Sequence, residues 1–333
     1  MNTMTRNLLL AGLFLAALVS AQAQYTLNPL WAGNVGNPNY WYLTNNNTHR
    51  GLAFNRETGH LIVVSRYPTN GVHILDPDTG AFLGSLKYSS ALLTGGALVI
   101  NLVGVADDGA IYVGNVTAPG SVANPSIFRL YRWSGEADTD EPVLAFNGDA
   151  SDGSLDNLQR RFGDTLTVRG SGVGTQVLIA SRSGSLVSLL RTADGTNFVA
   201  TPLISGIPLG TGSLGLYWGG GDTFYAKAPS TPLRLLQMDI AAGTAPALAS
   251  PNNQSLFTPP YSGVIPATTA GLGYDPVSHL LALVNYSAHT VSLYDLSDPN
   301  NPILQDTKTF PAPAAANPYR QRCGLRGRTA TVQ

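Results

Sequence analysis

Short apolar runs alternate with polar turn segments along residues 51–86 of the chain. The four apolar runs cover residues 52–54, 61–64, 72–75 and 82–86. The segments between them contain Thr-Gly, Pro-Thr-Asn-Gly and Pro-Asp-Thr-Gly, which are typical of turns. This pattern predicts four β-strands joined by three tight connections.

The same four-strand unit recurs four more times. Glycine markers at the start of each copy (Gly51, Gly104, Gly163, Gly215 and Gly271) lie 52 to 59 residues apart. A repeat of about 50 residues with four strands is typical of β-propeller blades. The sequence therefore predicts an all-β propeller of four-stranded antiparallel blades, with a pair of β-sandwiches or a β-helix as the alternatives.

The first residues carry the features of an export signal. Arg6 precedes an apolar run over residues 8–19, and the small residues Ala21 and Ala23 form a cleavage site. The run is shorter than the roughly 20 apolar residues that a membrane span needs. We therefore predict a signal peptide over residues 1–23, no membrane insertion, and a mature protein in the periplasm, at the cell surface or outside the cell.

Charge and cysteine content narrow the classes of partner and fold. Only 12% of the residues are charged and the formal net charge is -1, which argues against nucleic acid or an anionic membrane surface as a partner. The single cysteine, Cys323, excludes a disulfide within the chain. The propeller must therefore depend on its apolar core for stability.

Three segments carry a resemblance to a known family. They are Asn-Thr-His-Arg-Gly-Leu-Ala-Phe-Asn at residues 47–55, the second-copy hairpin at residues 103–112, and Arg-Gly-Ser-Gly at residues 169–172. Together they resemble an uncharacterised family of secreted bacterial propellers, domain-of-unknown-function family 4623, with repeats similar to those of surface-layer propellers. The resemblance covers roughly residues 25–310 and implies fold and export, but no catalytic residue. It also implies that an amino-terminal strand at residues 27–31 closes the last blade together with carboxy-terminal strands.

The carboxy-terminal end departs from this resemblance. After residue 310 the chain is rich in Pro and Ala and then in Arg, with no strand alternation. We therefore predict a propeller domain over residues 24–316 with six blades, of which five are recognisable repeats and the last is incomplete. Residues 317–333 are interpreted as an atypical tail, either disordered or read out of frame.

Blade geometry predicts where a ligand would bind. Since the strands of a blade are antiparallel, the connection between its second and third strands lies on the same face as the connections between blades. The residues that end the second strands or enter the first copy on this face are Arg66, Asn115, Arg182, Lys227, Asn285, His49 and Arg50. They predict a basic mouth suited to an anionic small molecule or a carbohydrate. The alternative is that Arg66 and Arg182 are solvated or paired with nearby carboxylates.

Evidence for catalysis is weaker. Propeller hydrolases of the lactonase type hold Ca²⁺ with carboxylates, which are missing from the second-strand ends. Asp149, Asp152 and Asp156 form a weak Ca²⁺ candidate that is more typical of an Asp-Gly turn loop. The chain also has no Gly-x-Ser-x-Gly elbow. We therefore favour a secreted module that binds a ligand or a protein partner without a cofactor. The alternatives are a metal-dependent propeller hydrolase and a purely structural surface or adhesion protein.

Overall fold

The computed structural model describes most of the chain from residue 25 onward. The described residues are 25–44, 46, 48–120, 124–137, 139–151, 161–182, 184–205, 215–228, 233–245, 265, 269–285, 288–299, 301–310, 323–326 and 329–332. The predicted signal peptide lies outside these residues. No helix within these ranges is long and apolar enough to cross a membrane.

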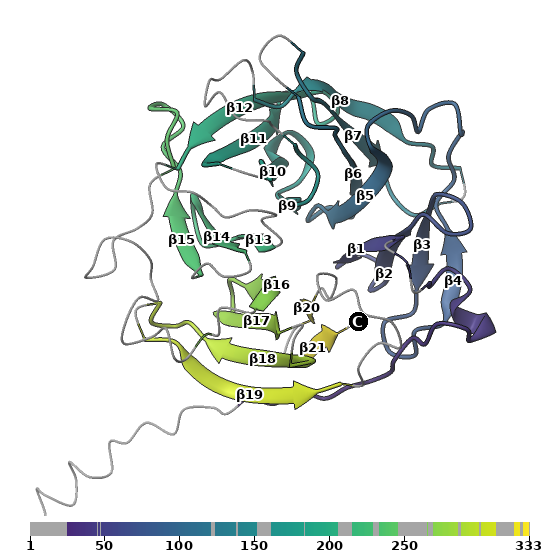
Figure 1. Cartoon of the computed structure of the whole chain (residues 1–333), viewed down its shortest axis with the longest axis vertical. Helices are drawn as coiled ribbons and strands as arrows, with labels where there is room; N and C mark the ends of the chain where they lie inside the picture. Colours follow the sequence, from purple (N-terminus) through teal and green to yellow (C-terminus); the bar gives the residue numbers. More distant parts are fainter. Residues whose placement is uncertain are drawn as a thin grey trace, which may run out of the picture.

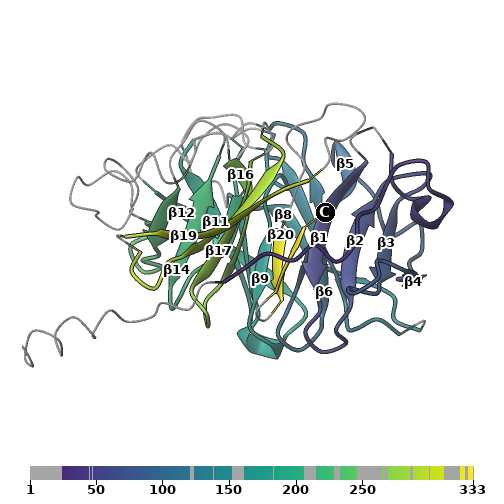
Figure 2. The same cartoon turned by 90° about the horizontal axis from the view of Figure 1, so that it is seen from below.

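Five antiparallel sheets stand around a common axis, with the first strand of each sheet innermost (Figure 1). Seen from the side, the ring is a shallow disc (Figure 2). The first blade comprises β1 His49–Phe54, β2 Leu61–Ser65, β3 Gly71–Leu75 and β4 Phe82–Ser85. The second comprises β5 Leu98–Val105, β6 Ile111–Val116, β7 Ile127–Trp133 and β8 Val143–Asp149. The third comprises β9 Thr167–Arg169, β10 Gln176–Ala180, β11 Leu186–Thr192 and β12 Phe198–Ile204.

Blades four and five continue the ring. Blade four comprises β13 Gly215–Trp218, β14 Thr223–Lys227 and β15 Arg234–Gln237. Blade five comprises β16 Thr269–Asp275, β17 Leu280–Asn285, β18 Thr290–Asp295 and β19 Ile303–Thr309. The two short 3₁₀ turns are η1 Pro38–Tyr40 and η2 Gly172–Gly174. The predicted propeller and its five recognisable repeats are therefore confirmed, although the described part of blade four has three strands. Where a fourth strand was expected, the described residues form isolated bridges from Thr244 to Asp239 and to Ile204 of blade three.

Apolar side chains between neighbouring blades form the core. Strand residues alternate in direction, so each blade offers one apolar face to the preceding blade and one to the next. Between blades one and two, for example, Ile62 and Val72 pack against Val113 and Trp133. Similar clusters lie between blades two and three, three and four, and four and five. The sheets thus bury both faces, which explains why second and third strands such as Leu61–Ser65 are buried throughout.

The sector between blades five and one is filled by the two ends of the chain. Strands β20 Cys323–Arg326 and β21 Thr329–Val332 form a two-stranded antiparallel sheet there, and β20 contacts β16, β17 and β1 (Figure 1). Among the described residues, the last sector therefore holds a sheet of two strands. These two strands were not expected from the sequence, because the tail shows no alternation of apolar and polar residues. That the tail is read out of frame stays a prediction.

The amino-terminal segment covers the outside of the same sector. Residues 27–31 were expected to form a strand but do not; side chains of β19 hold the start of this segment instead. The amide of Tyr25 donates to Gln305 Oε1 at 3.1 Å, and that of Leu27 donates to Asp306 Oδ2 at 2.7 Å. Leu27 packs on blade five, while Tyr42, further along the segment, packs on blade one. The segment therefore bridges blades five and one.

Candidate functional site: an arginine-rich mouth

β-bulges shape the face on which second strands end. In blade one, His49 lies opposite Ser65 and Gly51 opposite Val64, which leaves Arg50 as the extra residue of β1. In blade two, the register of β5 shifts between Leu98 and Leu102, a stretch that contains Asn101. Bulges of this kind redirect a side chain and are common beside functional sites. Arg50 and Asn101 thus both lie where a first strand enters its blade.

A chain of hydrogen bonds links this face across the first three blades. The Arg66 guanidinium Nη1 donates to Asn101 Oδ1 at 2.9 Å and to the Ile100 carbonyl at 3.2 Å. The Asn101 amide Nδ2 in turn donates to the Gly163 carbonyl at 2.8 Å. Arg66 from blade one is therefore held over blade two, and Asn101 from blade two is held against the connection into blade three.

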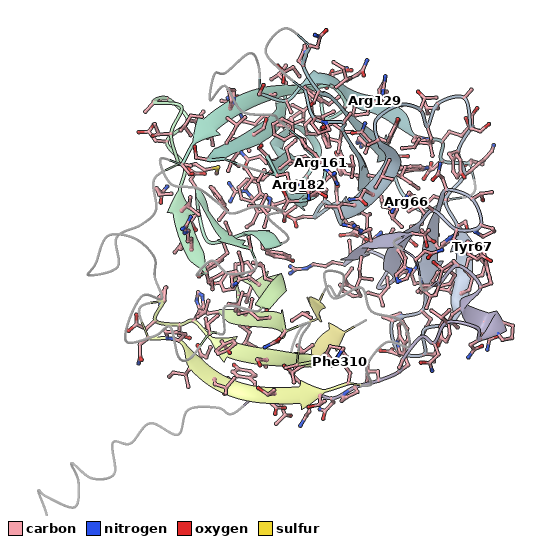
Figure 3. The ribbon with its side chains drawn as sticks, in the orientation of Figure 1. Arg66, Tyr67, Arg129, Arg161, Arg182 and Phe310 are labelled. Atoms are coloured by element: carbon pink, nitrogen blue, oxygen red, sulfur yellow. The ribbon has the colours of Figure 1, made fainter. Side chains whose placement is uncertain are left out.

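The connection into blade three brings a carboxylate to the arginines. Arg161 Nη2 donates to Asp164 Oδ1 at 3.0 Å, and Nε lies 2.8 Å from Oδ2 without a hydrogen-bonding angle. The Asp164 side chain is only 7% exposed and that of Arg161 is 23% exposed. The amide of Arg182 donates to the Arg161 carbonyl at 2.8 Å, so Arg161 and Arg182 are neighbours. Figure 3 shows Arg66, Arg161 and Arg182 on the inner side of the ring, along the arc of blades one to three.

Arg50 differs from its neighbours because, among the described residues, no group accepts a hydrogen bond from its side chain. Its Nε is buried without a partner. Burial lowers the pKa of Arg50; the Asp164 carboxylate opposes this change, whereas Arg161 and Arg182 add to it. Burial, together with the charge of Arg50, lowers the pKa of Arg66 to about 10. Both groups remain cations at neutral pH, so the cluster holds several positive charges around one carboxylate.

The other predicted site residues have different surroundings. Asn115 is fully buried, and its amide bonds the β7 backbone: Oδ1 accepts from Arg129 N at 2.9 Å and Nδ2 donates to Ile127 O at 3.4 Å. Lys227 is 1% exposed and donates to the Ala228 carbonyl at 2.8 Å; burial lowers its pKa to about 8. Asn285 Oδ1 accepts from the Ala288 amide at 3.1 Å. His49 is half-buried at the start of β1. Of the seven predicted residues, the hydrogen bonds and electrostatic contacts connect Arg50, Arg66 and Arg182.

Asp164 is the main residue that the sequence did not reveal. Asp164 follows Arg161 by three residues, which is the sequence feature that could have suggested the pair. In an irregular connection, however, this spacing does not determine which way the two side chains point. Within the described ranges, no group of three or more His, Cys, Asp or Glu side chains could hold a metal ion. Asp149 Oδ1 accepts from the amide and hydroxyl of Ser151, as in a turn. Asp152 and Asp156, the other members of the weak Ca²⁺ candidate, lie outside the described residues.

Comparison with known proteins supports the propeller fold but assigns no ligand or reaction. No family model matches the chain, and no curated protein matches its sequence. The structure is similar to that of a DUF4623 family protein from Bacteroides eggerthii, with a TM-score of 0.56 and 13% identity. The likeness is one of fold. The match covers 84% of this chain and 64% of that one, so the chain spans just under two thirds of this neighbour's length.

A second neighbour is similar over nearly the whole of both chains. It is Mala s 1, the major allergen of Malassezia sympodialis, with a TM-score of 0.53, 12% identity, and coverage of 88% of this chain and 87% of that one. Identities this low support a shared propeller architecture and transfer no residue roles. Function must therefore be argued from the arginine-rich mouth itself.

Proposed function

We propose that this protein is an exported propeller module that binds an anionic ligand at the arginine-rich mouth, defined as Arg50, Arg66, Arg161, Arg182 and Asp164. The observation that carries the proposal is Arg50, a half-buried residue whose guanidinium has no acceptor in the part of the chain that the structure describes. A buried donor without a partner costs about 1–3 kcal/mol. A carboxylate, sulfate or phosphate group of a ligand would supply acceptors that match the guanidinium geometry.

The neighbours of Arg50 support the same proposal. Arg161 is held by Asp164, and Arg66 is held by Asn101 and a carbonyl, so the framework around Arg50 is fixed before a ligand arrives. Such preorganisation lowers the entropy cost of binding. Arg182 is exposed beside them and can contribute a second fork of donors.

Titration calorimetry with citrate as the probe tests this function. We expect wild-type protein to bind citrate, and the double variant Arg50→Gln/Arg182→Gln to bind it at least about tenfold more weakly, since two charge-assisted contacts are lost. Arg56→Gln is the matched control because Arg56 makes the same charge change on the exposed turn between β1 and β2, at the opposite end of those strands. Absence of citrate binding, or an equal loss in Arg56→Gln, would contradict the proposal.

A further inference from the structure

The amide side chain of Asn101 connects parts of the arginine-rich mouth that come from different blades. We propose that Asn101 is the positioning residue of the mouth: it fixes where the guanidinium of Arg66 lies relative to the connection into blade three, and thereby sets the affinity for the anion. This inference rests on the proposed function and assigns the residue on which the geometry of that site depends.

Asn101 acts from behind the mouth. Its exposed fraction is 0%, so a ligand in the mouth does not touch it. It lies in the stretch of β5 where the register against β6 shifts between Leu98 and Leu102, and a bulge of this kind redirects a side chain. Any effect of Asn101 on binding must therefore pass through the residues that it holds.

The two hydrogen bonds of Asn101 require an amide. Arg66 Nη1, which can only donate, lies 2.9 Å from Oδ1, and the Gly163 carbonyl, which can only accept, lies 2.8 Å from Nδ2. An Asp side chain at this position would lack the donor, and a Leu side chain would lack both groups. Through this amide, blade two joins a side chain of blade one to the connection into blade three.

The connection that Asn101 holds is closely fitted to blade two. Gly163 has φ +96, and a Cβ atom there would overlap the Asn115 carbonyl at the end of β6. Beside it, the Phe162 amide donates to Thr117 Oγ1 at 3.0 Å, and the Thr117 amide donates to the Phe162 carbonyl at 3.0 Å. The bond from Asn101 completes a set of contacts that leaves this connection little room to shift.

The same connection carries charged groups of the mouth. Arg161 and Asp164 lie on either side of the residue whose carbonyl Asn101 holds. The Arg182 amide donates to the Arg161 carbonyl at 2.8 Å, so this arginine is tied to the connection as well. Loss of the Asn101 amide would loosen the connection and Arg66 together. The mouth would then have to be ordered by the ligand, which weakens binding.

A matched pair of asparagine variants tests this role. Asn55, directly after β1 at the opposite end of that strand, is 1% exposed, and its Nδ2 donates to Glu136 Oε1 of blade two at 2.6 Å. Asn101→Ala and Asn55→Ala therefore each remove a buried amide that joins blades one and two, and both should lower the free energy of unfolding in urea. In titration calorimetry with citrate, we expect Asn101→Ala to bind at least about tenfold more weakly than the wild type, and Asn55→Ala to bind within about twofold of it.

A double-variant cycle with Arg66 separates positioning from a general loss of structure. If Asn101 acts in part through Arg66, the contact with Arg66 is lost only once in Asn101→Ala/Arg66→Gln. The loss of citrate affinity in this double variant should then be smaller than the product of the two single losses. If Asn101→Ala does not fold, Asn101→Ser, which keeps a hydroxyl group, takes its place in both comparisons.

The possible failures are distinguishable. The positioning role is overturned if Asn101→Ala binds citrate as the wild type does, if Asn55→Ala loses as much affinity, or if the two single losses simply multiply. The proposed function stands in these cases, provided that the wild type binds citrate and Arg50→Gln/Arg182→Gln weakens it. Absence of citrate binding by the wild type overturns both.

Discussion

Replacing Asp164 by Asn isolates the electrostatics of the mouth, because it removes one charge and keeps the side-chain shape. In the wild type, Asp164 Oδ1 accepts from Arg161 Nη2 at 3.0 Å, and both side chains are largely buried. Removing one partner of a buried pair costs about 3–5 kcal/mol when burial is complete. Arg161 keeps 23% exposure, so we expect a loss of about 2–4 kcal/mol in the free energy of unfolding.

The same variant should become sensitive to anions. With Asp164 neutralised, no carboxylate among the described residues pairs with Arg50, Arg161 or Arg182. Sulfate in the tens of millimolar should then recover part of the lost stability through binding to the folded state, beyond the effect of chloride at equal ionic strength. Urea denaturation followed by tryptophan fluorescence measures both quantities.

A surface pair supplies the control for this experiment. Asp222 lies 3.3 Å from Arg169 and is 59% exposed. Asp222→Asn should therefore cost less than about 1 kcal/mol and gain nothing specific from sulfate. The reasoning is refuted if Asp164→Asn costs no more than Asp222→Asn, or if sulfate stabilises the two variants equally.

Three further predictions concern the mouth, a buried histidine and the closure of the ring. Arg50→Gln should raise the free energy of unfolding by about 0.5 kcal/mol in urea denaturation, since it removes a half-buried cation that has no acceptor among the described residues; a clear loss would show an unrecognised structural role. Burial lowers the pKa of His73 to about 4, below its unfolded value near 6.5, so the unfolded state binds more protons between these values and stability should fall by up to about 3 kcal/mol as the pH drops from 6.5 to 4. His73→Asn should flatten that part of the stability profile, and an unchanged slope contradicts the assignment. Gly80→Ala should cost about 2 kcal/mol because Gly80 has φ +72 and an added Cβ would lie 2.5 Å from the Trp31 ring; an unchanged unfolding midpoint would show that Trp31 is not fixed there.

The blades could be predicted from sequence because their determinants are local. Period-two apolar runs and turns such as Asp76 to Gly80 set each meander, and five copies at a common spacing identify the ring. The contacts that close the ring between blades five and one could not be predicted in this way. The amide of Leu27 bonds Asp306, 279 residues further along the chain, through a side chain and without a strand ladder. No local pattern encodes such a contact.

The sequence predicts on which face a residue lies more readily than what its side chain contacts, for a physical reason. Counting strand ends predicts Arg50, Arg66 and Arg182 on one face, since antiparallel connectivity fixes which end of a strand lies there. The hydrogen-bond partner of each side chain, in contrast, depends on the residues packed around it. Asn115 lies at an equivalent strand end, yet its amide bonds the β7 backbone. Asp164 comes from an irregular connection whose direction the sequence does not specify.

The most direct test of the central claim is a crystal of the mature protein soaked in selenate, a dianion with an anomalous signal. The account predicts an anomalous peak at the mouth, within hydrogen-bond distance of the guanidinium groups of Arg50 and Arg182, that is absent from crystals of Arg50→Gln/Arg182→Gln. Selenate peaks elsewhere on the surface, with none at Arg50 at an occupancy that saturates those other sites, would contradict it.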